Sequence, residues 1–138
     1  MDYKLEVVVV PVSDVDRAKQ FYCDRVGFHL DVDHAQGHYR VVQMTPPGSA
    51  CSITIGTGLV DSAPGSLKGI QLVVADIDAA RADLLSRGVE TSSVQHHDGT
   101  RFAEGKGGDW NSFIFFSDPD GNAWTVQESP TLRAERGS

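Results

Sequence analysis

Histidine and carboxylate side chains are the groups in this sequence that can move protons near neutral pH. His97 opens a glycine-rich stretch, Asp109 lies near the end of that stretch, and Glu128 follows the last apolar run of the chain. An imidazole and a carboxylate at one pocket mouth could act as general base and general acid. These three residues are therefore the candidates for metal-free acid–base catalysis.

The remaining nucleophilic and metal-ligating residues form weaker patterns. His34 and His38 have the spacing of two ligands on one helix face, but Gly37 between them favours a turn. We expect both histidines on the surface. Cys51 has no histidine near it in the sequence and is expected to face the core, where a thiol is inert.

The stretch 96–110 is long for a connection in a small domain, and such loops are often functional. It contains four glycines and two aromatic residues, Phe102 and Trp110. Glycines would let the loop open and close. We predict a lid in which Trp110 or Phe102 stacks on a flat ligand. The alternative is a mobile surface loop.

The elements that must position these residues occur twice. Placing Asp14 over Asp76 (76 − 14 = 62) aligns Val7–Arg25 with Gly69–Arg87. Each copy reads as an apolar strand, a turn that begins with aspartate and an amphipathic helix. The sequence therefore predicts an internal duplication.

Local signals define the two helices and the strands that follow them. Ser13 is expected to cap the first helix, and Gly27 and Gly88 lie where the two helices should end. The predicted strands after the helices are 28–33, 39–44 and 52–55 in the first half, and 89–95, 112–116 and 123–127 in the second. Each half is thus a βαβββ module.

The chain length favours a single domain. We expect this domain to span residues 1–130, with modules at about 5–57 and 69–128 and a linker at 58–68 that is rich in glycine. The polar tail 131–138 is expected to fray.

The repeated module, with Phe21-Tyr22 in the first half and the turn 117–122 in the second, resembles the vicinal-oxygen-chelate superfamily. This superfamily includes glyoxalase I, extradiol dioxygenases, fosfomycin-modifying enzymes and bleomycin-binding resistance proteins. The resemblance covers about residues 5–128. It implies an α+β fold in which two tandem βαβββ modules form curved mixed sheets around a ligand cavity, and it implies a homodimer.

The resemblance also implies four metal-ligand positions, which are Val7, Ser52, Gly69 and Thr125 in this chain. None is a histidine or a glutamate, whereas a divalent ion needs imidazole or carboxylate ligands. Glu6 and Glu128 lie at odd offsets from Val7 and Thr125, so strand alternation places them on the wrong face, as solvated strand-end acids. We therefore expect no metal and no cofactor, although a divalent metal at other positions stays open.

Strand alternation also predicts which side chains face the cavity. They are mixed, with aliphatic groups beside hydroxyls and amides, as in many pockets for organic ligands. The predicted ligand-binding residues are Val7, Val9, Ser52, Thr54, Gln71, Val73, Trp110, Thr125 and Gln127. The alternative is that these polar groups bond only to one another or to water.

The charge composition indicates which classes of binding partner are not expected. The formal net charge is −7, and no cluster of lysine and arginine is present, so nucleic acid and anionic membranes are not expected partners. The longest apolar run, Val7–Val12, is far shorter than the ~20 residues of a membrane span. The start of the chain lacks the pattern of a secretion signal, so a cytoplasmic protein is expected.

Three functions stay open. The first is a binding module that takes up a small, largely neutral organic molecule without metal, with a resistance or sequestration role. The second is a lyase, isomerase or dioxygenase that uses a metal at non-standard positions or the acid–base residues above. The third is a purely structural role, in which the pocket is closed and the sheet surface serves only assembly.

Overall fold

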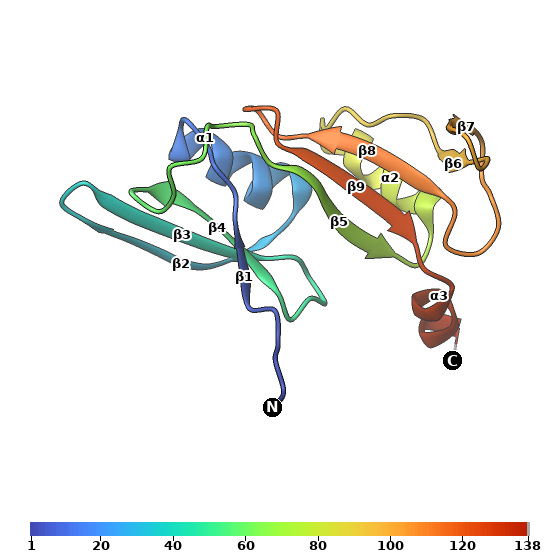
Figure 1. Cartoon of the computed structure of the whole chain (residues 1–138), viewed down its shortest axis with the longest axis horizontal. Coiled ribbons are helices and arrows are strands. Elements are labelled where there is room, and N and C mark those ends of the chain that lie inside the picture. Colours follow the sequence, from blue (N-terminus) through green and yellow to red (C-terminus); the bar gives the residue numbers. More distant parts are fainter. Residues whose placement is uncertain (138) are drawn as a thin grey trace. The chain divides into compact units, whose positions relative to one another are not determined.

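The computed structural model describes residues 1–137 (Figure 1). The chain divides into two compact units. Unit 1 consists of Met1–Leu67 together with the turn Asp118–Asn122, and unit 2 consists of Lys68–Ser117 together with the residues from Ala123 onward. Each unit contains one copy of the repeat, which confirms the α+β class.

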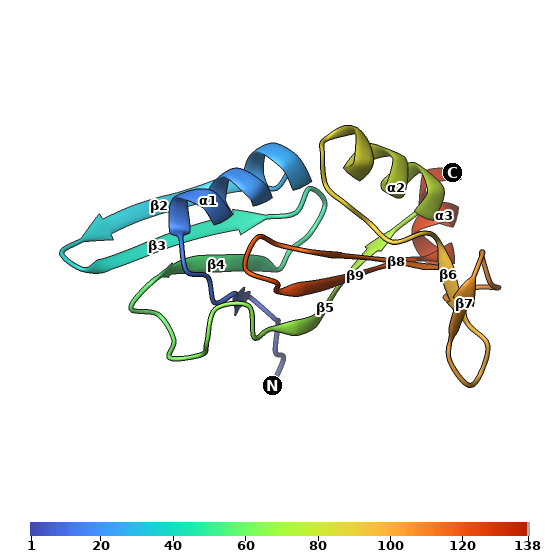
Figure 2. The same cartoon turned by 90° about the horizontal axis from the view of Figure 1, so that it is seen from above.

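Unit 1 is a four-stranded mixed sheet with one helical segment. Its elements are β1 (Val7–Val9), α1 (Val15–Gln20), the π-helical turn η1 (Phe21–Val26), β2 (His29–Gln36), β3 (Tyr39–Thr45) and β4 (Ser52–Thr57). The strand order is β1-β4-β3-β2, with β1 parallel to β4 and the other neighbours antiparallel. The sheet is open, and α1 lies against one of its faces (Figure 2).

The cap of α1 differs from the prediction. Asp14, not Ser13, is the N-cap residue, and its side chain accepts the Arg17 N–H at 3.0 Å. Ser13 instead donates its N–H and its hydroxyl to Asp120. Gly27 ends the helical segment as expected, because its φ of 93° lies in the left-handed region that favours glycine.

The core of unit 1 lies between α1, η1 and the sheet. Tyr22 is fully buried there, and its hydroxyl donates to Asp118 Oδ2 at 2.7 Å. Asn122 donates to the same carboxylate and to the Pro11 carbonyl, which ties the turn 118–122 into unit 1. The apolar core residues are Val10, Ala18, Phe28, Val42, Met44, Ile53 and Ile55.

Unit 2 repeats the arrangement with one extra strand. Its elements are β5 (Lys68–Val74), α2 (Ile77–Ser86), β6 (Gln95–His97), β7 (Phe102–Glu104), β8 (Phe113–Ser117), β9 (Ala123–Glu128) and α3 (Pro130–Gly137). The strand order is β5-β9-β8-β6-β7, with β5 parallel to β9. Asp76 caps α2 and pairs with the Ala79 N–H, as Asp14 does in the first copy. The core residues Ile77, Leu84, Ile114, Phe116, Trp124 and Val126 are buried.

Three predictions about unit 2 were wrong. The strand predicted at 89–95 begins only at Gln95, because Ser92 pairs with the Phe115 backbone through its own N–H and hydroxyl. The predicted long loop contains the hairpin β6–β7. The polar tail forms α3, whose first turn is held by the Ser129 hydroxyl accepting the Leu132 N–H. No helix within residues 1–137 is both long and apolar enough to cross a membrane.

Candidate functional site

The sheet face of unit 2 that α2 leaves uncovered is the first candidate site. The register pairs Gln71 with Thr125 and Val73 with Gln127 across β5 and β9. It also pairs Phe113 with Gln127 and Phe115 with Thr125 across β8 and β9. Paired residues project to the same side of a sheet, so these six side chains share one face. Trp124 and Val126 point to the other face, under α2.

Three phenylalanines on this face form an aromatic platform: Phe102, Phe113 and Phe115. The ring of Phe102 meets Phe113 edge-on at a centroid distance of 5.5 Å and Phe115 at 5.1 Å. The rings of Phe113 and Phe115 are stacked and nearly parallel, with an interplanar angle of 9°. Phe102 is 45% exposed. Phe113 and Phe115 are half-buried. A partly exposed aromatic cluster of this kind suits a flat apolar ligand, because offset stacking and area burial both favour binding.

Beside the aromatic platform runs a chain of amide hydrogen bonds. The Gln71 amide donates to Gln127 Oε1 at 2.5 Å, and the Gln127 amide donates to the Trp110 carbonyl at 2.7 Å. These two hydrogen bonds orient both glutamine side chains and hold the backbone carbonyl of Trp110 in place. Trp110 has a φ of 62°, which is strained for a residue with a side chain, and its ring is 46% exposed.

The open face of unit 1 mixes valines with hydroxyl groups that bond to one another. Ser52 and Thr54 on β4 lie opposite Val7 and Val9 on β1, as the sequence alternation predicts for their register. The Ser52 hydroxyl lies 2.6 Å from the Thr45 hydroxyl, and Thr45 donates to Asp31. Ser52 and Thr54 are both buried. The hydroxyl of Ser52 is therefore already engaged within the unit.

The four positions at which relatives hold a metal do not carry suitable ligands. Val7 and Ser52 lie opposite each other in unit 1. In unit 2, Gly69 lies at a register shift in β5, and Thr125 lies opposite Gln71. Within residues 1–137, no group of three or more histidine, cysteine, aspartate or glutamate side chains is placed to hold a metal ion. The side chains at these positions offer two hydroxyls, those of Ser52 and Thr125, but neither an imidazole nor a carboxylate.

Glu128 is not the solvated strand-end acid that the sequence predicts. It is 7% exposed and accepts the Ile77 N–H at 3.0 Å, at the start of α2. Lys106 Nζ lies 3.5 Å from its carboxylate, and Arg133 donates to the same group. Burial raises the pKa of Glu128, but the Ile77 N–H and the two cations outweigh burial, so the pKa lies below its usual range. Glu128 follows Gln127 and so points to the helical side of the sheet, away from the aromatic platform.

Of the other two acid–base candidates, His97 ends β6 and Asp109 lies between β7 and β8. The ring of His97 packs edge-on against Phe102 at 5.2 Å, and its Nδ1 accepts the Gly99 N–H at 3.1 Å. Asp109 is exposed in a turn. His97 therefore borders the aromatic platform, whereas Glu128 anchors helices.

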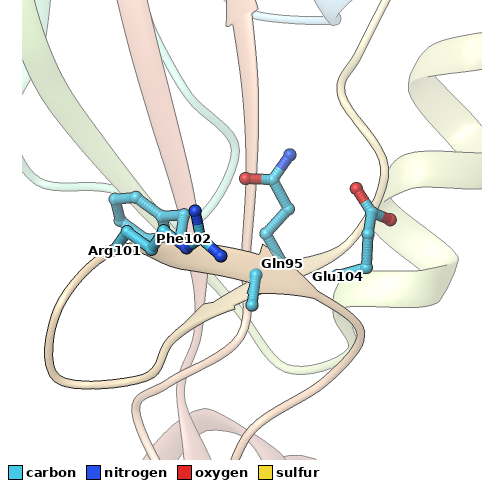
Figure 3. A pocket seen from close by; sticks show the side chains of 5 residues that line it. Gln95, Arg101, Phe102 and Glu104 are labelled. Atoms are coloured by element: carbon cyan, nitrogen blue, oxygen red, sulfur yellow. The ribbon is translucent and has the colours of Figure 1, made fainter.

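The hairpin β6–β7 bears an open pocket of about 390 Å³ (Figure 3). Its lining residues are Gln95, Arg101, Phe102, Ala103 and Glu104. Sequence reasoning named only Phe102 among them, and it also missed Phe113 and Phe115. Strand alternation from Thr125 and Gln127 across to β8 could have found the two phenylalanines.

Comparison with known proteins agrees with this architecture. The sequence model of the Glyoxalase/Bleomycin resistance protein/Dioxygenase superfamily matches residues 4–126. The chain belongs to this superfamily. The vicinal-oxygen-chelate resemblance named that same group, so the fold expected from it is confirmed.

Several relatives match over nearly their whole length. TnmS3, an antibiotic binding protein from Streptomyces sp. CB03234, is 32% identical with a TM-score of 0.75, and the match covers 93% of this chain and 97% of that one. A glyoxalase/bleomycin resistance protein from the same strain is 33% identical with a TM-score of 0.72, covering 90% and 99%. The protein YetH of Bacillus subtilis (strain 168) is 28% identical over 127 residues, covering 91% and 98%.

Proposed function

We propose that this superfamily member binds a small, flat, largely neutral aromatic molecule on the open face of unit 2 and sequesters it without a metal. The observation that carries the proposal is the aromatic platform, in which exposed Phe102 contacts the half-buried Phe113 and Phe115 beside the hydrogen-bonded amides of Gln71 and Gln127. The similarity to TnmS3, an antibiotic binding protein, supports an antibiotic as the natural ligand class and resistance as the role.

The chemistry of the face favours binding over turnover. A stacked ring loses water from apolar surface and gains about 0.5–1.5 kcal/mol from each well-placed aromatic pair. The glutamine amides of Gln71 and Gln127 can orient polar substituents of the ligand, but amides do not exchange protons near neutral pH. His97 is the titratable residue that we place at the border of the aromatic platform, and its Nδ1 is occupied by a backbone N–H.

The proposal is tested by fluorescence titration of the full chain with naphthol as the probe. We expect Phe102→Ala to weaken naphthol binding about 10-fold, because it removes one of the three rings of the aromatic platform. Leu85→Ala is the matched control, since Leu85 has a similar exposed fraction of 43% but lies on α2. Equal losses in both variants, or no saturable binding to the wild-type protein, would overturn the proposal.

Metal independence is part of the proposal and has its own measurement. Protein dialysed against a chelator should bind naphthol with unchanged affinity, and add-back of Mn, Fe, Co, Ni or Zn should produce no thermal shift. Near one equivalent of a single metal by elemental mass spectrometry, together with loss of binding on chelation, would instead support a metal-dependent enzyme.

We also propose that the protein is a homodimer, as members of this superfamily commonly are, and that it is cytoplasmic. Light scattering coupled to size exclusion measures the mass directly. A monomeric mass at micromolar concentration would contradict the proposed dimer and would leave the ligand proposal unchanged.

A further inference from the structure

We infer that the hairpin pocket of β6–β7 recognises an ionised acidic oxygen on the ligand through Arg101 and a hydroxyl or amino donor through Glu104. The inference rests on the proposed function, because the ligand must first lie on the aromatic platform. It refines the ligand class to an aromatic scaffold that is neutral except for one ionised acidic group and that carries one hydrogen-bond donor.

The turn before β7 leaves the Arg101 guanidinium available to bind a ligand. Asp98 and Glu104 both lie three residues from Arg101, and neither forms an ion pair with it. The Asp98 Oδ1 accepts the N–H groups of Thr100 and Arg101 at 2.8 and 3.0 Å. The hydrogen bond from the Arg101 N–H lowers the pKa of Asp98 the most, and the bond from the Thr100 N–H lowers it further. Together they hold the Asp98 carboxylate in the turn. The Asp98 N–H donates to the Arg101 carbonyl at 2.9 Å, which closes the turn. Among the side chains that the structure describes, those of residues 1–135, none pairs with the Arg101 guanidinium.

Glu104 provides the opposite charge in the same pocket. Its carboxylate accepts the Ser93 hydroxyl at 2.8 Å and, in the described part of the chain, forms no ion pair. Figure 3 shows Arg101 and Phe102 at one end of the pocket and Glu104 at the other, with Gln95 between them. A carboxylate with a single neutral donor has free lone pairs for a ligand O–H or N–H.

The pocket and the aromatic platform share one residue. Phe102 lines the pocket and also contacts Phe113 and Phe115. A ring stacked on the aromatic platform therefore brings its substituents to the hairpin. A guanidinium binds a carboxylate through two parallel N–H bonds, which adds both strength and orientation, and it donates charge-assisted hydrogen bonds to the single oxygen of an ionised phenol. The net charge of −7 disfavours ligands with several negative charges, so a single acidic group fits best.

Three probes with one ring system separate the two contacts. They are a hydroxynaphthoate, the naphthoate that lacks its hydroxyl, and the naphthol that lacks its carboxylate. Dissociation constants are measured by fluorescence titration of the full chain at fixed ionic strength, for wild type and for Arg101→Gln, Arg101→Lys and Glu104→Gln. Arg87→Gln is the control, since Arg87 is an exposed arginine in unit 2 that pairs with Asp83.

We expect Arg101→Gln to weaken both naphthoates about 10-fold and to leave naphthol within about 2-fold. Arg101→Lys should recover part of the loss, because lysine keeps the charge but lacks the planar fork. Glu104→Gln should weaken the hydroxynaphthoate and spare the naphthoate without a hydroxyl. Arg87→Gln should change none of the three.

The outcomes separate this inference from the proposed function. If Arg101→Gln leaves the naphthoates within about 2-fold of wild type while Phe102→Ala weakens all three probes, the inference is wrong and the aromatic platform stands. If no probe saturates the wild-type protein below about 1 mM, the proposed function and the inference both fail. Thermal unfolding of each variant checks that the hairpin substitutions leave the fold intact.

Discussion

Glu128→Gln should destabilise this protein while leaving ligand affinity unchanged. The carboxylate joins the start of α2 through Ile77, the segment after β7 through Lys106 and α3 through Arg133. Glutamine keeps the size and one acceptor oxygen for Ile77 but loses the charge that both cations face. Glu128 therefore stabilises unit 2 by connecting three segments that are remote in sequence.

The expected loss follows from the exposure of the partners. The Lys106 and Arg133 side chains are 47% and 54% exposed, so solvent screens each pair, and each contributes about 0.5–1 kcal/mol. The charge-assisted bond from Ile77 weakens by about 1 kcal/mol when its acceptor becomes neutral. The variant should lose about 2 kcal/mol of unfolding free energy, or roughly 6–10 °C in Tm for a chain of this size.

The pH dependence provides a second readout. The folded-state pKa of Glu128 lies below the ordinary value of 4.5, despite burial, because of the Ile77 N–H and the two cations. A lowered folded-state pKa stabilises the protein fully above the unfolded-state value, and this stabilisation is lost as the pH falls through the folded-state value. The stability gap between wild type and variant should therefore be present at neutral pH and close under acidic conditions.

Urea unfolding at several pH values measures both effects, with Glu90→Gln as the control. Glu90 is an exposed glutamate of unit 2, and its substitution should be neutral. A Glu128→Gln variant as stable as wild type would refute the anchoring role. Unchanged stability with loss of turnover on some substrate would instead restore Glu128 as a catalytic residue.

Three further predictions concern unit 1. Tyr22→Phe removes the hydroxyl that donates to buried Asp118 and should cost about 1.5–3 kcal/mol in urea unfolding; a loss under about 0.5 kcal/mol would show that water replaces the bond. Gly65→Ala should destabilise the protein by more than about 1 kcal/mol in thermal unfolding, because the φ of 80° is left-handed and the new Cβ meets a backbone carbonyl. The control Gly108→Ala should be neutral, because Gly108 has open space around it and no left-handed φ. The arginine and lysine hydrogen bonds to Asp33 lower its pKa from 3.8 to about 2, so Asp33→Asn should be less stable than wild type above pH 3.8 and should match it near pH 2; a gap that persists in acid would contradict this assignment.

Much of the fold could be predicted because the repeat and the alternation are physical constraints that the sequence displays. Gly27 and Gly88 both have left-handed φ values where the helices were predicted to end, whereas the cap of the first helix is Asp14 and not the predicted Ser13. The first-half strands and the last two strands of the second half begin and end within a few residues of their predicted bounds. The division into a single domain over 1–130 stays a prediction.

The hairpin could not be predicted because its strands carry no strand pattern. β6 and β7 are each three residues long, and neither shows the run of β-branched residues by which strands are recognised. Their pairing depends on the backbone of the turn that Asp98 organises, which is a contact between residues of ordinary turn composition. Arg101 and Glu104 were missed for the same reason, since their meeting in one pocket follows from that pairing.

Glu128 was misjudged because alternation predicts a face and not an environment. Its position on the helical side of β9 is the one that alternation assigns. The sequence did not show that Lys106 and Arg133 would reach that side and allow a carboxylate to be buried there. A buried charge needs partners, and these partners come from segments that were predicted to be a loop and a frayed tail.

The two copies of the repeat differ where function is proposed and agree where the fold is built. Val10 and Leu72, which alternation turns toward the helices, are apolar in both copies. On the open face, Val9 in the first copy corresponds to Gln71 in the second, and only the second copy carries neighbouring phenylalanines. The open face of unit 1 bonds its hydroxyls to one another, whereas that of unit 2 leaves aromatic rings in contact with water. Water contact with contiguous rings costs free energy that a ligand recovers on binding, so the ligand is expected on unit 2.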